Sequence, residues 1–156
     1  MGPTLHDELG PLAFLLGTWV GEGEGAWAGG EPFAYGEEMV FEQIGEPYLV
    51  YAQRSWELGD RTPIHLERGF FRPAGRGRVE AALAHPLGIV ETAEGTLHEG
   101  VLDLVATTVG RTSTGSPATE LRRRIDVHDA VLRYELWMAT EHVALARHLR
   151  GELKRT

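Results

Sequence analysis

Cysteine is absent from this chain of 156 residues. Disulfides, thiolate metal sites and cysteine nucleophiles are therefore all excluded. Long apolar runs are also missing, since no stretch approaches the roughly 18 apolar residues that cross a bilayer. The first ten residues carry Asp7 and Glu8 instead of the basic and apolar segments of a signal peptide. These absences predict a cytoplasmic protein with no membrane partner.

Positive charge is scarce, with 15 Lys and Arg residues against 23 Asp and Glu residues. The resulting net charge of −8 would repel phosphates, so nucleic acid is not an expected partner. Arg122, Arg123 and Arg124 form a local exception. Because they alternate with Leu121 and Ile125, we interpret them as a solvated strand face. The oligomeric state stays open, a homodimer included.

The composition is that of one globular domain over residues 1–156, with 42% hydrophobic and 24% charged residues. Twenty glycines and eight prolines suit many short strands joined by turns. Apolar and polar residues alternate with a period of two, most clearly where Leu132, Tyr134, Leu136 and Met138 share one face. Strands are predicted over 17–25, 35–44, 48–57, 63–72, 77–84, 87–94, 96–107, 121–127 and 131–138.

This spacing predicts an all-β fold of nine or ten antiparallel strands in an up-and-down order. So long a sheet would curl, and closing it into a barrel removes its exposed edges. Residues 5–16 are expected to form a short helical cap, broken at Gly10–Pro11. A tight hairpin is expected at His128–Ala130. Residues 145–155 fit a strand and a helix equally well.

The run from Leu16 to Gly23 contains Gly17, Trp19, Gly21 and Gly23 at alternate positions. Glycine inside a strand marks a bend or a close approach of another backbone. A large tryptophan among the glycines suits a barrel that curves sharply and closes its floor.

Five further segments follow this run in order, at residues 31–35, 63–70, 84–91, 136–140 and 147–149. Together with the glycine run they resemble the nitrobindin family over roughly residues 10–155. The resemblance implies a lipocalin-like β-barrel that binds ferric haem b, isomerises peroxynitrite to nitrate and binds nitric oxide. Without cysteine, such a haem must be held by histidine and packing.

The resemblance also implies which residues surround the haem. His148, followed by Leu149, matches the proximal iron ligand and would be the catalytic and metal-binding residue. His142 is the alternative ligand. The haem pocket would be lined by Phe33, Ile64, His65, His85 and Met138, with Gly29 where the family often carries a threonine.

Two of these histidines have other interpretations. Glu67 lies on the same strand face as His65 and could hold it in a purely structural role. His85 precedes Pro86 and fits a hydrated position on the rim equally well. None of the seven histidines forms the His-x-x-x-His pair of a zinc hydrolase.

A different class of function is a non-enzymatic carrier of fatty acid or another apolar ligand, as in related barrels. Such carriers fix a carboxylate with inward arginines, for which Arg54 and Arg68 are the candidates. A third hypothesis is a haem chaperone or nitric oxide sensor that uses the same site without turnover.

Overall fold

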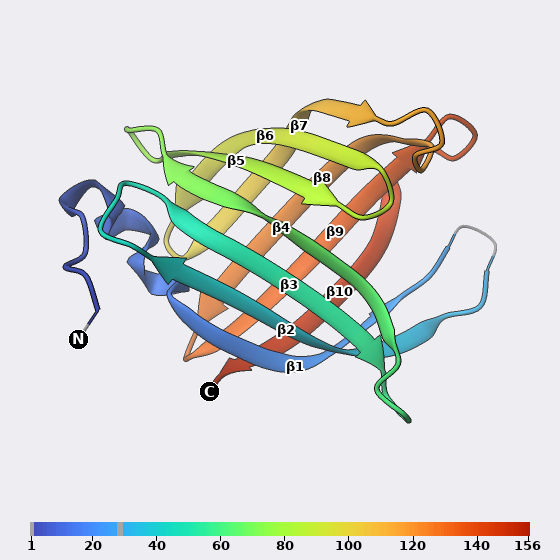
Figure 1. The fold of residues 1–156 in the computed structure, drawn as a ribbon, viewed down its shortest axis with the longest axis horizontal. Helices are drawn as coiled ribbons and strands as arrows, with labels where there is room; N and C mark the ends of the chain where they lie inside the picture. The colour runs from blue at the N-terminus through green and yellow to red at the C-terminus, as the bar shows by residue number, and fades with distance from the viewer. Residues whose placement is uncertain (1, 28–29) are drawn as a thin grey trace.

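A computed structural model describes residues 2–27 and 30–156 of the chain. It contains one short helix and ten strands (Figure 1). Their bounds are η1 Asp7–Leu15, β1 Gly17–Gly25, β2 Phe33–Gln43, β3 Leu49–Glu57, β4 Pro63–Pro73, β5 Arg78–His85, β6 Ile89–His98, β7 Val101–Arg111, β8 Ala118–His128, β9 Val131–Thr140 and β10 Ala146–Arg155.

Each strand pairs antiparallel with the next, and β1 also pairs with β10, which closes the barrel. The predicted up-and-down barrel is therefore confirmed, with ten strands. Residues 145–155 fitted a strand and a helix equally well in the sequence, and in the structure Ala146–Arg155 form strand β10. Closure leaves no strand edge free for pairing with another chain. In the described part of the chain, no helix is long and apolar enough to cross a membrane.

The predicted start of one strand, at residue 96, was wrong. The expected strand over 96–107 runs across a turn, because β6 ends at His98 and β7 begins at Val101. Glu99 and Gly100 have φ values of 48° and 79°, as a two-residue hairpin with the twist of its strands requires. The hairpin expected at His128–Ala130 is confirmed, with positive φ at both Asp129 and Ala130.

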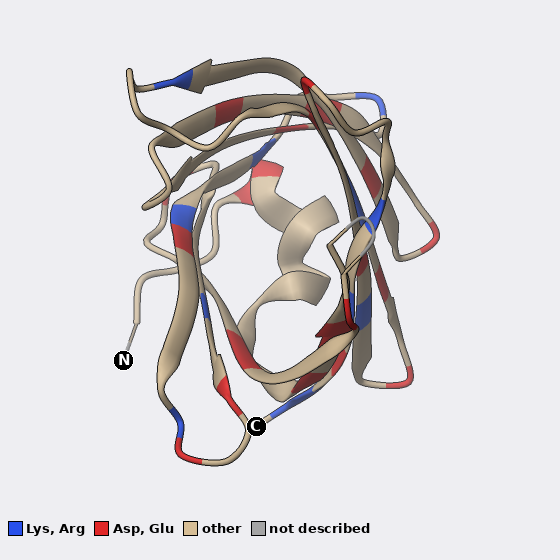
Figure 2. Cartoon of the chain, turned by 90° about the vertical axis from the view of Figure 1, so that its right-hand side faces the viewer, with Lys and Arg blue, Asp and Glu red and all other residues tan. Residues whose placement is uncertain are grey.

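The N-terminal cap is a 3₁₀ helix that lies across one end of the barrel (Figure 2). It continues through Pro11, so the expected break at Gly10–Pro11 is wrong. Leu9, Leu12 and Leu15 are all fully buried in the core, and this packing holds the short helix despite its proline.

Trp19 extends from strand β1 into the end of the barrel that η1 covers, as expected of an apolar plug. Its side chain is fully buried, and its indole nitrogen donates a hydrogen bond of 2.8 Å to the Leu15 carbonyl. The guanidinium of Arg155 lies 4.4 Å from the ring centroid. Trp19 therefore joins η1 to the strands β1 and β10.

The glycines of β1 permit close contacts on both sides of the strand. A Cβ atom on Gly21 would lie 2.1 Å from the Glu152 carbonyl oxygen of β10, and one on Gly23 would lie 2.5 Å from the Tyr35 ring of β2. This confirms the close approach predicted from the motif, since any larger residue would push apart the strands that close the barrel.

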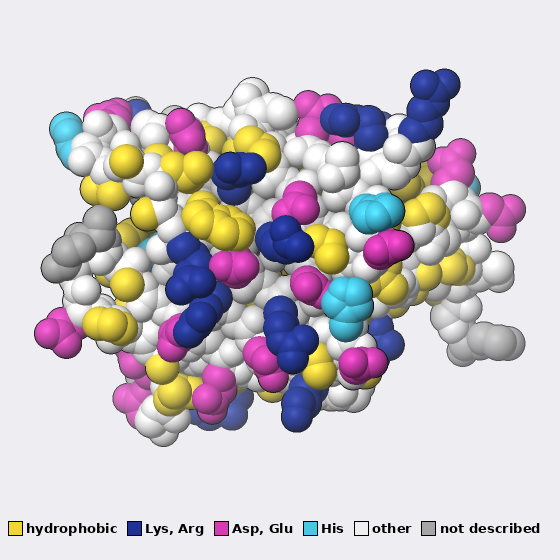
Figure 3. All heavy atoms as spheres, turned by 180° about the vertical axis from the view of Figure 1, so that it is seen from behind, with side chains coloured by type: hydrophobic (Ala, Val, Ile, Leu, Met, Phe, Trp, Pro, Cys, Tyr) yellow, Lys and Arg dark blue, Asp and Glu magenta, His cyan; other side chains and the backbone are white. Residues whose placement is uncertain are grey.

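The outer surface carries charges of both signs. Acidic and basic side chains alternate on the face turned away from the viewer in Figure 1 (Figure 3). Several pair across neighbouring strands, such as Arg133 with Glu152 at 3.0 Å. Exposed pairs of this kind add little to stability, but they leave that face without a broad basic patch.

Candidate functional site

The end of the barrel away from η1 contains a cavity of about 370 Å³. Side chains from β2, β3, β4, β5, β6, β8, β9 and β10 contribute to its wall. It brings together all the expected pocket residues that the structure describes, namely Phe33, Ile64, His65, His85, Met138 and His148. Gly29 lies outside the described residues.

His148 enters the cavity at an irregularity in β10. The pairing with β9 shifts between Arg147 and Leu149, so His148 is the extra residue of a β-bulge. Bulges redirect a side chain relative to the regular alternation of a strand. Here the redirected side chain is the imidazole that the family resemblance singles out.

The orientation of the His148 ring is fixed by a backbone hydrogen bond. Nδ1 lies 3.0 Å from the Ala26 carbonyl oxygen. A carbonyl only accepts hydrogen bonds, so Nδ1 carries the proton and Nε2 keeps its lone pair. Burial lowers the pKa of His148, which further favours the neutral ring. A neutral imidazole with a free Nε2 and a held Nδ1 is the form that binds a metal.

Aromatic rings pack around this imidazole. The ring centroid of Trp27 lies 4.2 Å from that of His148, and the Phe33 centroid lies 6.4 Å away. The importance of Trp27 was missed in the sequence because it follows β1, outside any alternating segment. His142, the alternative ligand, is exposed in the turn between β9 and β10 and does not line the cavity.

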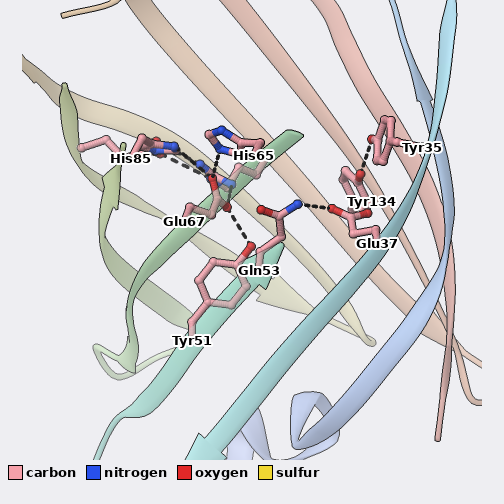
Figure 4. A network of polar contacts seen from close by, with 10 residues as sticks. Tyr35, Glu37, Tyr51, Gln53, His65, Glu67, His85 and Tyr134 are labelled. Carbon is pink, nitrogen blue, oxygen red and sulfur yellow. Dashed lines mark hydrogen bonds and ion pairs between the residues drawn. The ribbon is translucent and has the colours of Figure 1, made fainter. Parts of the chain in front are cut away.

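A group of buried charged side chains forms another part of the cavity wall, in contrast to the aromatic rings around His148 (Figure 4). Arg123 donates to Glu67 and to Glu91, each at 2.9 Å. His85 lies between the same two carboxylates, with Nδ1 3.1 Å from Glu67 and Nε2 2.7 Å from Glu91. Tyr51 donates a 2.7 Å hydrogen bond to Oε1 of Glu67, the oxygen that also accepts from Arg123, whereas His85 contacts Oε2.

The pKa values follow from this arrangement. Burial disfavours the charged form of His85, but its bonds to Glu67 and Glu91 raise its pKa to about 9. Burial alone would raise the pKa of Glu67, yet Arg123, His65 and His85 hold it well below its ordinary value. Two carboxylates therefore face two cations, and the group is neutral as a whole.

Several expectations are corrected here. His85 is no hydrated rim residue, since its side chain is only 7% exposed. Arg123 points inward and is 10% exposed, so the interpretation of the arginine run as a wholly solvated face was wrong. Arg54 and Arg68, the candidates for a carrier's carboxylate site, are both exposed on the outer surface.

His65 agrees with both of its interpretations. It lines the cavity, and its Nε2 lies 3.7 Å from Glu67. Its ring stacks on that of His85 with centroids 5.7 Å apart.

A second polar group lies on β2, β3 and β9 (Figure 4). Gln53 donates a 2.7 Å hydrogen bond to Glu37, and the hydroxyl groups of Tyr35 and Tyr134 are hydrogen-bonded to each other. Burial raises the pKa of Glu37 to about 7. One oxygen of Glu37 and one of Gln53 have no partner among the described residues. None of these four residues was identified from the sequence as part of the site.

The cavity therefore combines a neutral imidazole, aromatic and aliphatic walls, and charges that are already paired. Such a site fits a flat apolar group that carries a metal, because the metal needs a ligand and the rest needs packing. Fold and site together define a closed β-barrel with an interior cofactor pocket.

Comparison with known proteins agrees with this class. The family model "THAP4-like, heme-binding beta-barrel domain" matches residues 8–155. Peroxynitrite isomerase 2 of Mycobacterium ulcerans is 42% identical over 99% of both chains, and peroxynitrite isomerase 1 of Rhodococcus jostii is 38% identical over 92% of this chain and 82% of its own. The crystal structure of Rv2717c from M. tuberculosis superposes with a TM-score of 0.91 at 35% identity, covering 98% of this chain and 99% of the other.

The chain belongs to the nitrobindin family of haem-binding β-barrels. Haem is thus the cofactor of this fold, in agreement with the expectation from the sequence.

Proposed function

We propose that this protein is a haem-dependent peroxynitrite isomerase in which His148 would bind the haem iron. The observation that carries the proposal is the His148 imidazole, whose Nδ1 is held by the Ala26 carbonyl and whose Nε2 makes no hydrogen bond to the residues that the structure describes. The names of the relatives described above support the reaction.

A haem held by His148 would supply the iron chemistry that converts peroxynitrite to nitrate, a rearrangement that conserves all atoms of the substrate. The chain's own residues would hold the cofactor. The Ala26 carbonyl fixes the imidazole plane, Trp27 and Phe33 pack against the imidazole, and Met138 supplies apolar wall. We infer that the same bound haem would also bind nitric oxide.

Four of the buried charged side chains are engaged with one another. Glu67, His85, Glu91 and Arg123 already satisfy one another. A peroxidase needs a free acid and base to cleave its substrate heterolytically, and these groups are not free. An isomerisation conserves all atoms of its substrate and needs no such pair.

The reaction is tested by mixing the hemin-loaded chain with peroxynitrite in a stopped-flow instrument and measuring the nitrate formed. We expect the decay rate to rise in proportion to the loaded chain and nitrate to become the main product. His148→Ala with the same hemin content is expected to be at least about tenfold slower. A loaded wild type that decays peroxynitrite no faster than the haem-free chain would contradict the proposal.

A further inference from the structure

The cavity wall contains three potential metal ligands that sequence spacing did not connect. His65 and Glu67 lie two residues apart on β4, and their side chains share the inner face of the barrel. The pairing of Arg68 with Ala84 brings the neighbouring Glu67 and His85 of β5 side by side. One ligand atom from each of the three residues lies within 4.8 Å of the other two (Figure 4).

The separations suit a shared ion. Glu67 Oε2 lies 3.1 Å from His85 Nδ1 and 3.7 Å from His65 Nε2. Ligand atoms that each bind one ion at 2.0–2.2 Å in tetrahedral geometry lie roughly 3.4 Å apart. The ligand atoms of His65 and His85 lie within 4.8 Å of each other, so a shift of the part-exposed His65 side chain would be needed to bring all three atoms onto one ion.

The residues behind these ligands orient them as metal sites require. The Nε2 atom of His85 faces Glu91 at 2.7 Å, which directs Nδ1 toward Glu67. Tyr51 and Arg123 donate to Oε1 of Glu67, so its Oε2 is the oxygen that faces the two histidines. A carboxylate behind a ligand histidine and donors behind a ligand carboxylate are regular features of metal centres.

The charges are also compatible with a divalent cation. Glu91 offsets Arg123, so the remaining donor set is one carboxylate and two imidazoles. An ion would take the place of the proton between His85 and Glu67. Two histidines and one carboxylate with open positions form a donor set for divalent first-row transition metals.

We propose that His65, Glu67 and His85 form a binding site for one divalent first-row transition metal ion in the wall of the cavity, separate from His148. The proposal does not depend on the haem reaction. Among the described residues these three form the only such group of histidine and carboxylate ligands within this separation. Its remaining coordination positions would face the cavity.

The test uses cobalt(II) as the probe, because its visible absorption reports the ligands that bind it. The full chain is stripped of metal with a chelator and titrated without hemin. We expect saturation at one cobalt ion per chain, displacement by zinc, and binding that is weaker by about tenfold or more in His65→Ala. His98→Ala is the matched control, since its side chain is 84% exposed, and it should bind like the wild type.

Thermal unfolding of His65→Ala checks that its fold is intact, which we expect because the side chain is part-exposed and its contact with Glu67 is long. The proposal is overturned if the wild type shows no saturable cobalt binding, or if His65→Ala binds cobalt as tightly as the wild type.

The test distinguishes failure of the metal-site proposal from failure of the haem proposal. We expect His148→Ala to keep the cobalt site while it loses the axial haem ligand. Cobalt binding that depended on His148 instead of His65 would overturn the proposed metal site.

Discussion

Replacement of Arg123 by methionine is expected to lower the free energy of unfolding by about 3–5 kcal/mol. Methionine preserves much of the side-chain length but removes the charge. The Glu67 and Glu91 carboxylates, which are 6% and 1% exposed, would then lie buried with only His85 to offset them. Removing one partner of a buried ionic group costs far more than the group itself contributes.

Urea denaturation at neutral pH measures this loss. Arg124→Met is the matched control, because Arg124 is the next residue on β8, is 46% exposed and lies 3.7 Å from an exposed aspartate. Its substitution should change the free energy of unfolding by about 0.5 kcal/mol or less. Adding Glu91→Gln to Arg123→Met should restore part of the loss. Equal effects of the two arginine substitutions would show that the buried charges are not coupled as the contacts indicate.

Replacement of Glu37 by glutamine is expected to change how stability depends on pH. Burial raises the pKa of Glu37 to about 7 from its ordinary value of 4.5, so the folded protein holds a proton that the unfolded chain has lost. Stability from this group is therefore fully present below pH 4.5, is lost as the pH rises from there through about 7, and levels off above that. Between pH 5 and pH 8 the titration of Glu37 should lower the free energy of unfolding of the wild type by about 2–3 kcal/mol.

Glutamine resembles the protonated acid and does not titrate, so Glu37→Gln should gain stability relative to the wild type by that amount between pH 5 and pH 8. Chemical denaturation across this range measures the difference. Glu42→Gln, an exposed position on the same strand, is the control for the substitution itself. A constant offset for Glu37→Gln would mean that Glu37 is ionised in the fold at low pH.

The alternation of apolar residues was enough to predict the barrel, because each strand buries one face and the period of two repeats along nearly the whole chain. The glycine run of β1 was equally informative, since its close contacts with β2 and β10 leave no room for side chains. The turn at Glu99–Gly100 was missed because glutamate is an unusual residue at a position that needs positive φ.

The site was harder to predict, for two physical reasons. First, an inward arginine and an exposed one look alike in an alternating segment, and Arg123 is inward only because two buried carboxylates from other strands receive it. Second, the contact between Glu67 and His85 depends on the register of β4 and β5, and the aim of His148 depends on a bulge in β10. Neither register nor bulge is encoded in any short pattern, so the prediction that His148 is the iron ligand came from family resemblance alone.

The most direct test of the haem site is a hemin titration of the wild type, His148→Ala and His142→Ala, followed by visible spectroscopy. We expect the wild type and His142→Ala to saturate at one haem per chain with the same sharp Soret band. His148→Ala should lose or shift that band, because Nε2 of His148 is the nitrogen left free to bind iron. A His148→Ala variant with the affinity and spectrum of the wild type would contradict the assignment of the iron ligand.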